Sequence, residues 1–207
     1  MITIIDYGLG NIQAFINIYK QLHIPLKVAK SVGDFAGCTK LILPGVGHFD
    51  YAMHQFNASG MRAKVESLVL QDNVPVLGVC VGMQIMAESS EEGVEPGLGW
   101  INGSVKSLVE IVKSDSNLPL PHMGWNSVTP KHKGLFGGIC ASDLEFYFLH
   151  SYYFHCLLPQ NCIATTCYGS KFSSAVNRKN IYGVQFHPEK SHRFGVRLLQ
   201  NFAELAV

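Results

Sequence analysis

The run VPVLGVCVGMQ at residues 74–84 is the feature that most constrains the fold of this chain. Its apolar first half predicts a buried strand, and residues 82–90 have the pattern of a helix. Cys80 lies between the two elements, with Gly78 before it and Gly82 after it. Glycines relieve the crowding of a tight strand-to-helix turn. The order of these residues is therefore typical of a nucleophile elbow.

An elbow would activate the thiol of Cys80. The free N–H groups of the following helix, together with the helix dipole, favour a thiolate over a thiol. Buried cysteines are more commonly inert apolar residues, so the elbow alone leaves both interpretations open. The other five cysteines lack such flanking glycines and are expected to be inert; they are Cys38, Cys140, Cys156, Cys162 and Cys167.

The rest of the chain predicts an α/β protein. Strands are predicted at residues 2–6, 26–29, 40–44 and 74–79, and helices at 11–22, 61–70 and 82–90. This alternation indicates a parallel sheet covered on both faces. Aromatic and β-branched runs then predict antiparallel or mixed strands, at residues 100–108, 125–130, 145–154, 163–169, 173–177 and 181–186, and a helix closes the chain at 193–205. No repeat or linker divides the sequence, so we expect one domain over residues 1–207.

A candidate base for Cys80 lies far along the chain, in YGVQFHPEKS at residues 182–191. A histidine can accept the thiol proton, and a carboxylate can hold the imidazole in one tautomer. His187 and Glu189 are two residues apart, so on an extended segment they can face the same side. A strand-end histidine bonded to the backbone is the alternative. The elbow and this pair together favour a Cys–His–Glu triad.

The run LILPGVGHF at residues 41–49 supplies a third part of such a site. Pro44, Gly45, Val46 and Gly47 follow a predicted strand. A glycine-rich turn allows backbone N–H groups to point at one position, as an oxyanion hole requires. In a parallel sheet, the turn lies at the carboxyl edge, beside the elbow. An ordinary strand-to-helix turn would fit the same residues.

Composition and charge disfavour several other classes. The chain has 16 basic and 15 acidic residues without a basic run, so neither nucleic acid nor an anionic membrane is an expected partner. The N-terminal run lacks a basic region and is interrupted by Asp6, and no apolar run approaches the roughly 20 residues of a membrane helix. The cysteines have no metal-ligand spacing. We therefore expect a cytoplasmic protein with reduced cysteines and neither metal nor cofactor.

The motifs GVCVGMQ, FHPEKS and LPGVGHF together resemble those of class I, triad-type glutamine amidotransferases. From end to end, the chain more closely resembles the glutaminase subunits of imidazole glycerol phosphate synthases. This resemblance rests on four further runs, which are IIDYGLGN at residues 4–11, HMGWN at 122–126, FYFLHSYYF at 146–154 and HPEKS at 187–191. It implies a flavodoxin-like three-layer sandwich with a mixed, mostly parallel central sheet.

The resemblance also implies a mechanism and roles for residues. Cys80 would attack the side-chain amide of glutamine, with His187 as base and then acid, and with Glu189 as its orienting carboxylate. Backbone N–H groups of Val46 and Val81 would hold the oxyanion, once the Val46 peptide turns inward. Glutamine itself would be held by Gly45, Gly47, Gln84, Ser151 and Tyr152.

A partner is implied as well. Subunits of this family dock on a (β/α)8 cyclase subunit, into which the ammonia passes. There it meets a ribulosyl-aminoimidazole carboxamide nucleotide and yields imidazole glycerol phosphate and AICAR, in histidine biosynthesis. The positions that match the partner-facing surface are Asn11, Trp125, Tyr147 and Lys190. Each has a structural alternative, namely a helix end for Asn11, core positions for the two aromatic residues and a solvated position for Lys190.

Other functions remain open at this point. NIQAFINIYKQLHIP at residues 11–25 and GLGWING at 97–103 resemble a paralogous branch, which supplies ammonia for amidated or acetamidino sugars of surface polysaccharides. The glutaminase chemistry would then be the same and the acceptor different. A stand-alone cysteine hydrolase, such as a γ-glutamyl hydrolase or a small stress-protein peptidase, is disfavoured by the HPEK run and by the length of 207 residues. A non-catalytic member would lack a triad residue, and none is missing.

Overall fold

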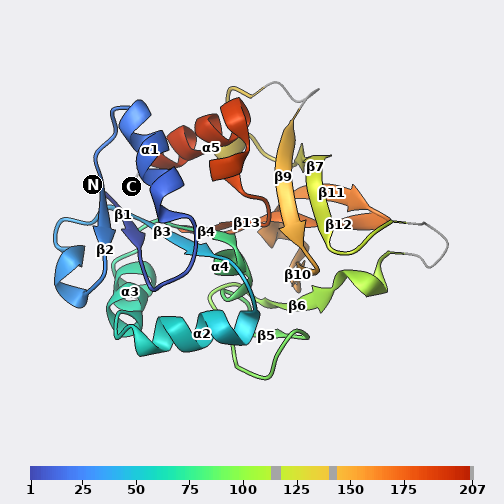
Figure 1. The fold of residues 1–207 in the computed structure, drawn as a ribbon, viewed down its shortest axis with the longest axis horizontal. Helices are drawn as coiled ribbons and strands as arrows, with labels where there is room; N and C mark the ends of the chain where they lie inside the picture. Colours follow the sequence, from blue (N-terminus) through green and yellow to red (C-terminus); the bar gives the residue numbers. More distant parts are fainter. Residues whose placement is uncertain (113–117, 140–143, 206–207) are drawn as a thin grey trace.

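The computed structural model describes residues 1–112, 118–139 and 144–205. Cys140, one of the cysteines predicted to be inert, lies outside the described residues. In the part described, a mixed sheet runs through the molecule in the order β2-β1-β3-β4-β13-β12-β10-β6-β5 (Figure 1). The parallel strands of its first half are β1 (Ile2–Ile5), β2 (Leu26–Ala29), β3 (Lys40–Gly45), β4 (Val76–Cys80) and β13 (Ile181–Val184).

Beyond β13 the sheet becomes largely antiparallel. Its strands there are β12 (Ser170–Arg178), β10 (Tyr152–Cys156), β6 (Gly103–Ser107) and β5 (Ser89–Ser90), and β11 (Cys162–Tyr168) pairs with both β12 and β8 (Thr129–Pro130). A separate two-stranded antiparallel sheet consists of β7 (His122–Ser127) and β9 (Glu145–His150). The predicted change from parallel to antiparallel pairing in the second half is confirmed.

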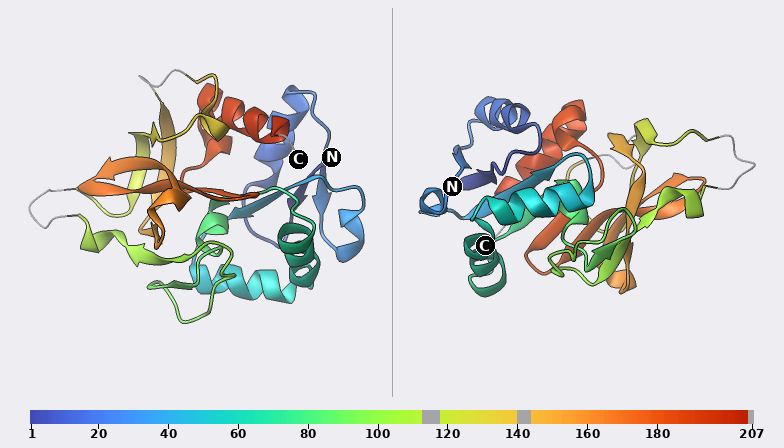
Figure 2. Two further views of the ribbon diagram at one scale, coloured as in Figure 1. Left: turned by 180° about the vertical axis from the view of Figure 1, so that it is seen from behind. Right: turned by 60° about the horizontal axis from the view of Figure 1, so that its bottom comes forward.

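Helices cover both faces of the parallel strands, as Figures 1 and 2 show. On one face lie α1 (Ile12–Gln21) and α5 (His192–Glu204), and on the other lie α2 (Phe49–Ala58) and α3 (Arg62–Glu66), which continues into a π-helical turn (Ser67–Gln71). Short 3₁₀ turns are η1 (Val32–Phe35), η3 (Leu108–Glu110), η4 (Gly134–Phe136), η6 (Pro159–Asn161) and η7 (Pro188–Lys190). This is the predicted three-layer α/β arrangement.

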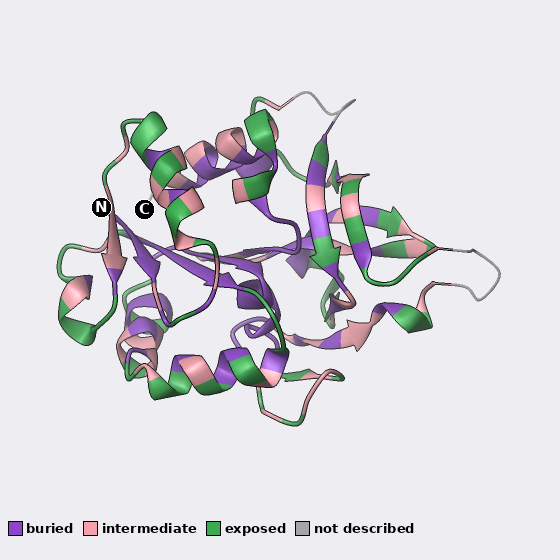
Figure 3. Ribbon diagram, viewed as in Figure 1, coloured by how far each residue is buried: buried purple, intermediate pink, exposed green. Residues whose placement is uncertain are grey.

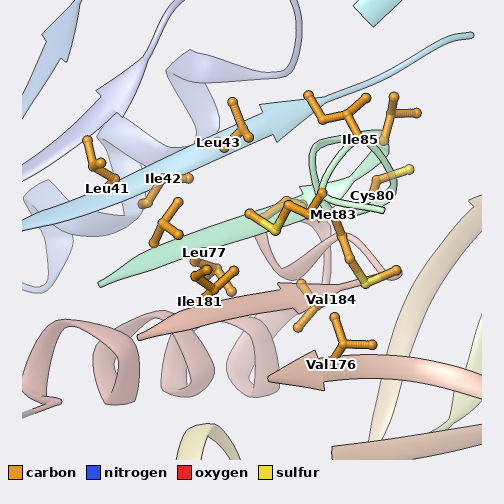
Figure 4. Packing of buried hydrophobic residues seen from close by; sticks show 14 of the residues in the cluster. Leu41, Ile42, Leu43, Leu77, Cys80, Met83, Ile85, Val176, Ile181 and Val184 are labelled. Atoms are coloured by element: carbon orange, nitrogen blue, oxygen red, sulfur yellow. The ribbon is translucent and has the colours of Figure 1, made fainter. Parts of the chain in front are cut away.

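The buried core lies between these layers. All residues of β1, β3 and β4 are buried, because helices exclude water from both faces of the sheet (Figure 3). Ile42 of β3 pairs with Leu77 of β4, and Ile181 of β13 lies on the other side of β4 (Figure 4). No helix among the described residues is long and apolar enough to span a membrane.

Two predictions of helices need correction. The helix predicted over residues 82–90 is a single turn, α4 (Val81–Gln84). After it, Leu98 N donates to Ile85 O and Gly97 N to Glu88 O, so the backbone bonds to residues 97–98 instead of continuing the helix. Conversely, α2 was not predicted, although its buried residues have helical spacing. They are Phe49, Ala52, Met53 and Phe56.

The strand predicted over residues 145–154 is also divided in two. It breaks at Ser151 into β9, which pairs with β7, and β10, which pairs with β6 and β12. The change of partner brings the backbone around Ser151 to the edge where β4 ends. This break matters for the site, because it places residues 149–152 beside Cys80.

Candidate active site

The sharp turn predicted at Cys80 is present. β4 ends at Cys80 and α4 begins at Val81, with φ 55° and ψ −115° at the cysteine (Figure 4). These angles belong to a region that glycine occupies readily and other residues rarely do. A Cβ on Gly82 would overlap the carbonyl oxygen of Leu43, and one on Gly78 would lie 2.6 Å from the carbonyl oxygen of Gly82. Both glycines are therefore required by close backbone packing around the turn.

Cys80 lines a cavity of about 310 Å³. The cavity brings together residues from the ends of three strands and from the loops between them. Its lining residues are Val46, Gly47, Cys80, Val81, Gln84, Glu92, Pro121, Leu149, His150, Ser151, Tyr152, His187 and Lys190. Among them are the predicted nucleophile, the predicted base and both predicted oxyanion donors.

His187 and Glu189 form an ion-pair contact in which Nδ1 lies 2.8 Å from Oε1, and their side chains are only 3% and 2% exposed. The backbone of this segment is fixed as well. The N–H of His187 donates to Tyr147 O at 2.8 Å, and Ser191 Oγ donates to His187 O at 2.6 Å. Ser191 Oγ also accepts from Tyr147 N at 3.0 Å. β9 therefore holds the histidine in place from one side.

The electrostatics favour a protonated His187. Burial by itself would lower the pKa of this imidazole, but hydrogen bonds to Cys80 and Glu189, and the charges of both groups, outweigh burial and hold the pKa above its usual range. A cationic imidazole is the partner that a cysteine thiolate needs in order to act as a nucleophile. Cys80 and His187 can thus exist as a thiolate beside an imidazolium.

The glycine-rich turn after β3 lies beside the elbow, as predicted. Gly45 pairs with Cys80 across β3 and β4, and Val46 and Gly47 follow it into the cavity. Gly45 itself is buried and does not line the cavity, because its Cα packs against the backbone of Gly82. The hydroxyl of Tyr7 donates to Pro44 O at 2.6 Å and anchors the strand just before the turn.

Gln84 has a defined amide orientation in the cavity wall. Its Nε2 lies 2.9 Å from Tyr152 O and 3.1 Å from Gln185 Oε1. Both N–H groups are therefore directed at acceptors inside the protein. The remaining polar atom is the amide oxygen, so Gln84 offers an acceptor to a molecule in the cavity.

Two polar cavity residues, Glu92 and His150, are not evident from the sequence. Glu92 lies in the EEGVEPG loop, where no motif marks it, and its Oε2 accepts from Phe49 N at 2.8 Å. That contact holds the carboxylate against the start of α2. The adjacent Ser151 could have indicated His150, since both lie within the FYFLHSYYF run.

Three of the four residues predicted to face a partner lie together, and the fourth, Asn11, caps a helix. Trp125, Tyr147 and Lys190 lie next to one another outside the triad: the two rings are 6.2 Å apart, and Lys190 Nζ lies 5.6 Å from the Tyr147 ring. Trp125 is 45% exposed and Tyr147 is half-buried, so neither is a core residue. Asn11 is the N-cap of α1, and its side chain accepts from Ala14 N at 3.2 Å.

The described cysteines show no sign of metal binding or pairing. Cys38, Cys80, Cys156, Cys162 and Cys167 are free thiols. Within residues 1–112, 118–139 and 144–205, no group of three histidine, cysteine or carboxylate side chains could hold a metal ion.

Comparisons with known proteins agree with this geometry. The sequence matches the family described as glutamine amidotransferase class-I over residues 3–205. It is 57% identical over 206 residues to the imidazole glycerol phosphate synthase subunit HisH of Bdellovibrio bacteriovorus, covering 99% of this chain and 100% of that protein. It is 49% identical over 205 residues to the HisH subunit of Leptospira interrogans, with the same coverage of 99% and 100%.

Solved structures share the fold at lower identity. The crystal structure of a glutamine amidotransferase superposes with a TM-score of 0.73 at 19% identity, covering 98% of this chain and 97% of that one. The structure of PurLQS from Thermotoga maritima gives a TM-score of 0.68 at 14% identity, with coverage of 98% and 97%. At such identities the likeness establishes the fold alone.

Proposed function

The chain belongs to the class-I glutamine amidotransferases, among the HisH subunits of imidazole glycerol phosphate synthase, and we propose on this premise that Cys80, His187 and Glu189 are its catalytic triad. As a glutamine amidotransferase of histidine biosynthesis, the protein hydrolyses glutamine and supplies the ammonia to a synthase reaction. In the proposed mechanism the ammonia passes directly to a (β/α)8 cyclase subunit bound beside the cavity.

The first half-reaction forms a thioester. The thiolate of Cys80 attacks the side-chain carbonyl carbon of glutamine, and the carbonyl electrons move to the oxygen. That oxyanion accepts hydrogen bonds from the backbone N–H groups of Val46 and Val81, which flank the nucleophile in the cavity. His187 then donates its proton to the amide nitrogen, the C–N bond breaks, and ammonia leaves.

The second half-reaction releases glutamate. Water attacks the thioester carbon while His187, now neutral, accepts the proton of the water molecule. The C–S bond breaks, the product leaves as a carboxylic acid that gives its proton to solvent, and the thiolate of Cys80 returns beside the protonated imidazole. Glu189 holds the ring through Nδ1 in both halves, so that Nε2 is the atom that exchanges protons.

The cavity can also bind the α-amino and α-carboxylate groups of glutamine. The α-amino group is a cation, and Gln84 Oε1 and the Glu92 carboxylate are the acceptors that the cavity offers to it. The α-carboxylate requires donors instead. Gly47, Ser151 and Tyr152 also line the wall and can supply them from the backbone.

One observation carries the proposal. Cys80 in its strained turn and the buried His187–Glu189 pair meet in one cavity, although they are more than 100 residues apart in the sequence. A cysteine that served only as a core residue would not need a backbone conformation that costs about 1–3 kcal/mol. Strain of this kind is kept where function requires the side chain in one place.

The partner is proposed to dock over Trp125, Tyr147 and Lys190. These residues are half-buried or exposed, and Lys190 also lines the cavity, so a protein bound to this surface would cover the site. Lys190 follows Glu189 directly and offers its charge to a carboxylate of the partner. Asn11, whose side chain caps α1, is proposed as part of this surface as well.

The acceptor is proposed to be the histidine-pathway nucleotide. The relatives with 57% and 49% identity are both named as imidazole glycerol phosphate synthase subunits. The test is glutamate release from glutamine by this chain alone, with the cyclase, and with the cyclase plus its nucleotide. Stimulation by the cyclase and its nucleotide supports this acceptor. A chain that the cyclase does not stimulate would instead point to a surface-sugar acceptor or to a stand-alone hydrolase.

A further inference from the structure

Gln185 contacts the nucleophile and has no part in the steps above. The side chain is completely buried, two residues before His187. Its Nε2 lies 3.8 Å from the sulfur of Cys80, within the range of a hydrogen bond to sulfur. An amide N–H in this position can stabilise a thiolate more than a thiol, because it points a partial positive charge at the sulfur.

The orientation of the Gln185 amide follows from its neighbours. Tyr152 O is a carbonyl and can only accept, so Gln84 must direct Nε2 towards it. The same Nε2 lies 3.1 Å from the Gln185 side chain, which must therefore present its oxygen there. With Oε1 facing Gln84, the amide nitrogen of Gln185 faces Cys80.

A pair of buried histidines extends the same chain of hydrogen bonds. His150 Nδ1 lies 2.8 Å from Tyr152 O, so this nitrogen carries a proton and donates it. His150 Nε2 lies 2.9 Å from His122 Nδ1, and His122 Nε2 lies 3.1 Å from Asn126 Nδ2. With neutral rings one arrangement satisfies every contact: Asn126 donates to His122, and His122 donates to His150.

The rings are held in this neutral arrangement by their surroundings. Burial lowers the pKa of His122 to about 4 and that of His150 to about 3. His122 is also stacked between Phe148, at 4.7 Å, and Tyr168, at 4.0 Å between ring centres. The hydrogen bonds therefore keep one direction at neutral pH, from Asn126 at the surface to the carbonyl of Tyr152.

We propose that Gln185 is a further catalytic residue, which donates a hydrogen bond from Nε2 to the Cys80 sulfur, and that His150 and His122 are positioning residues for it. His150 donates to the Tyr152 carbonyl, and this carbonyl fixes the orientation of the Gln84 amide. The Gln84 amide in turn fixes the orientation of the Gln185 amide. The inference deepens the proposed function and rests on it, since a donor to the sulfur matters only if Cys80 reacts as a thiolate.

The test measures alkylation of Cys80 by iodoacetamide as a function of pH in the full chain, with the modified peptide quantified by mass spectrometry. Gln185→Met keeps the length of the side chain and removes the donor. We expect the pH of half-maximal rate to rise by about one unit in this variant, because a hydrogen bond to the anion is lost. Gln160→Met, at an exposed position, serves as the control and should leave the midpoint unchanged.

The positioning residues are tested by a second pair of variants. His150→Leu removes the donor to Tyr152 O, whereas His150→Asn keeps an N–H near the position of Nδ1. We expect the leucine variant to raise the midpoint in the same direction as Gln185→Met, and the asparagine variant to restore at least half of the change. If Gln185→Met does not fold, the His150 pair decides the proposal. A wild-type midpoint in folded Gln185→Met, or equal midpoints for the two His150 variants, overturns it.

The alkylation assay uses no glutamine, so its outcome is separate from that of the proposed function. In a parallel glutaminase assay, Gln185→Met should lower kcat about tenfold and leave KM within about twofold, because Gln185 contacts the nucleophile and not the substrate. A shifted alkylation midpoint in a chain that does not hydrolyse glutamine would support the hydrogen bond and contradict the glutaminase. An unshifted midpoint in a chain that hydrolyses glutamine would support the glutaminase and contradict the hydrogen bond.

Discussion

The imidazole nitrogen Nδ1 of His187 lies 2.8 Å from the carboxylate oxygen Oε1 of Glu189, and almost no water reaches either side chain. The contact fixes which ring nitrogen remains for Cys80. The pKa of His187 is held above its usual range, so in the proposed mechanism the ring carries the proton that the leaving ammonia needs. The contact therefore gives the two residues unequal roles in the proposed mechanism.

The first prediction follows from these unequal roles. His187→Asn should lower kcat for glutamine hydrolysis by about 10³-fold or more, because thiolate formation and protonation of the leaving group both need the imidazole. Glu189→Gln should be milder, because it affects the orientation of the ring and leaves the imidazole in place to exchange protons. Steady-state kinetics of the two variants check the order. A Glu189→Gln enzyme that is less active than His187→Asn would contradict it.

The second prediction concerns the glycine after the nucleophile. Gly82→Ala should lower the free energy of unfolding by about 3 kcal/mol and abolish glutamine hydrolysis, because the new Cβ would overlap Leu43 O. Gly33→Ala is the matched control, since a Cβ there would meet nothing closer than 3.9 Å. Urea unfolding measures both. Equal stability of the two variants would show that the turn at Cys80 is less tightly packed than the structure indicates.

The third prediction uses the backbone of Cys80 itself. Both Cys80→Ala and Cys80→Gly remove the sulfur, but only glycine adopts φ 55° and ψ −115° without strain. Cys80→Gly should therefore be more stable than Cys80→Ala by about 1 kcal/mol, the reverse of the usual order of these residues. Thermal and urea unfolding of the two inactive proteins test this expectation. An alanine variant that is the more stable of the two would exclude strain at the elbow.

The fourth prediction is a dependence of stability on pH. His150 and His122 stay neutral in the folded protein down to about pH 4, whereas in the unfolded chain they take up protons near their ordinary pKa of about 6.5. Between these values the unfolded state binds more protons, so the free energy of unfolding falls as the pH falls, by up to about 1.4 kcal/mol per pH unit for each histidine. Urea unfolding at pH 7, 6 and 5 measures the slope.

A variant isolates the contribution of one ring to this slope. His150→Asn cannot take up a proton, so its stability should fall less steeply between pH 7 and 5 than that of the wild type. His187 has a raised pKa, and the stability that it contributes is fully present below about pH 6.5 and is lost only as the pH rises towards the folded value. It therefore adds little to the slope at low pH. Parallel slopes for the wild type and His150→Asn would contradict the account.

The sequence predicted those features of the site that short motifs encode. Cys80 between its glycines, and His187 two residues from Glu189, are local patterns whose geometry follows from backbone sterics. The prediction of a helix over residues 82–90 is wrong. Buried apolar residues such as Ile85 and Met86 are as compatible with a loop whose backbone bonds to a distant segment as they are with a helix. Only the pairing of this segment with residues 97–103 distinguishes the two.

Long-range contacts account for what the sequence could not show. Gln84 and Gln185 are 101 residues apart, and they meet because β4 and β13 are neighbours in the sheet. His122 and His150 meet through the register of β7 and β9, where they are paired directly. Both histidines stand in runs that resemble the family, but only the register shows that their rings meet. Glu92 likewise joins the cavity only through the contact of its loop with the start of α2.

The most direct test of the central claim is partner-stimulated release of glutamate, measured for the wild type and for Cys80→Ala. We predict slow hydrolysis of glutamine by the chain alone, and a rise in kcat of about 10²–10³-fold when the cyclase and its nucleotide are added, which is the effect of supplying one oxyanion donor such as the Val46 N–H. Cys80→Ala should release no glutamate under either condition, while its complex should still make product from added ammonium salt. Substantial glutamate release by Cys80→Ala would contradict the assignment of the nucleophile, and an isolated wild-type chain as fast as the complex would contradict control by a partner.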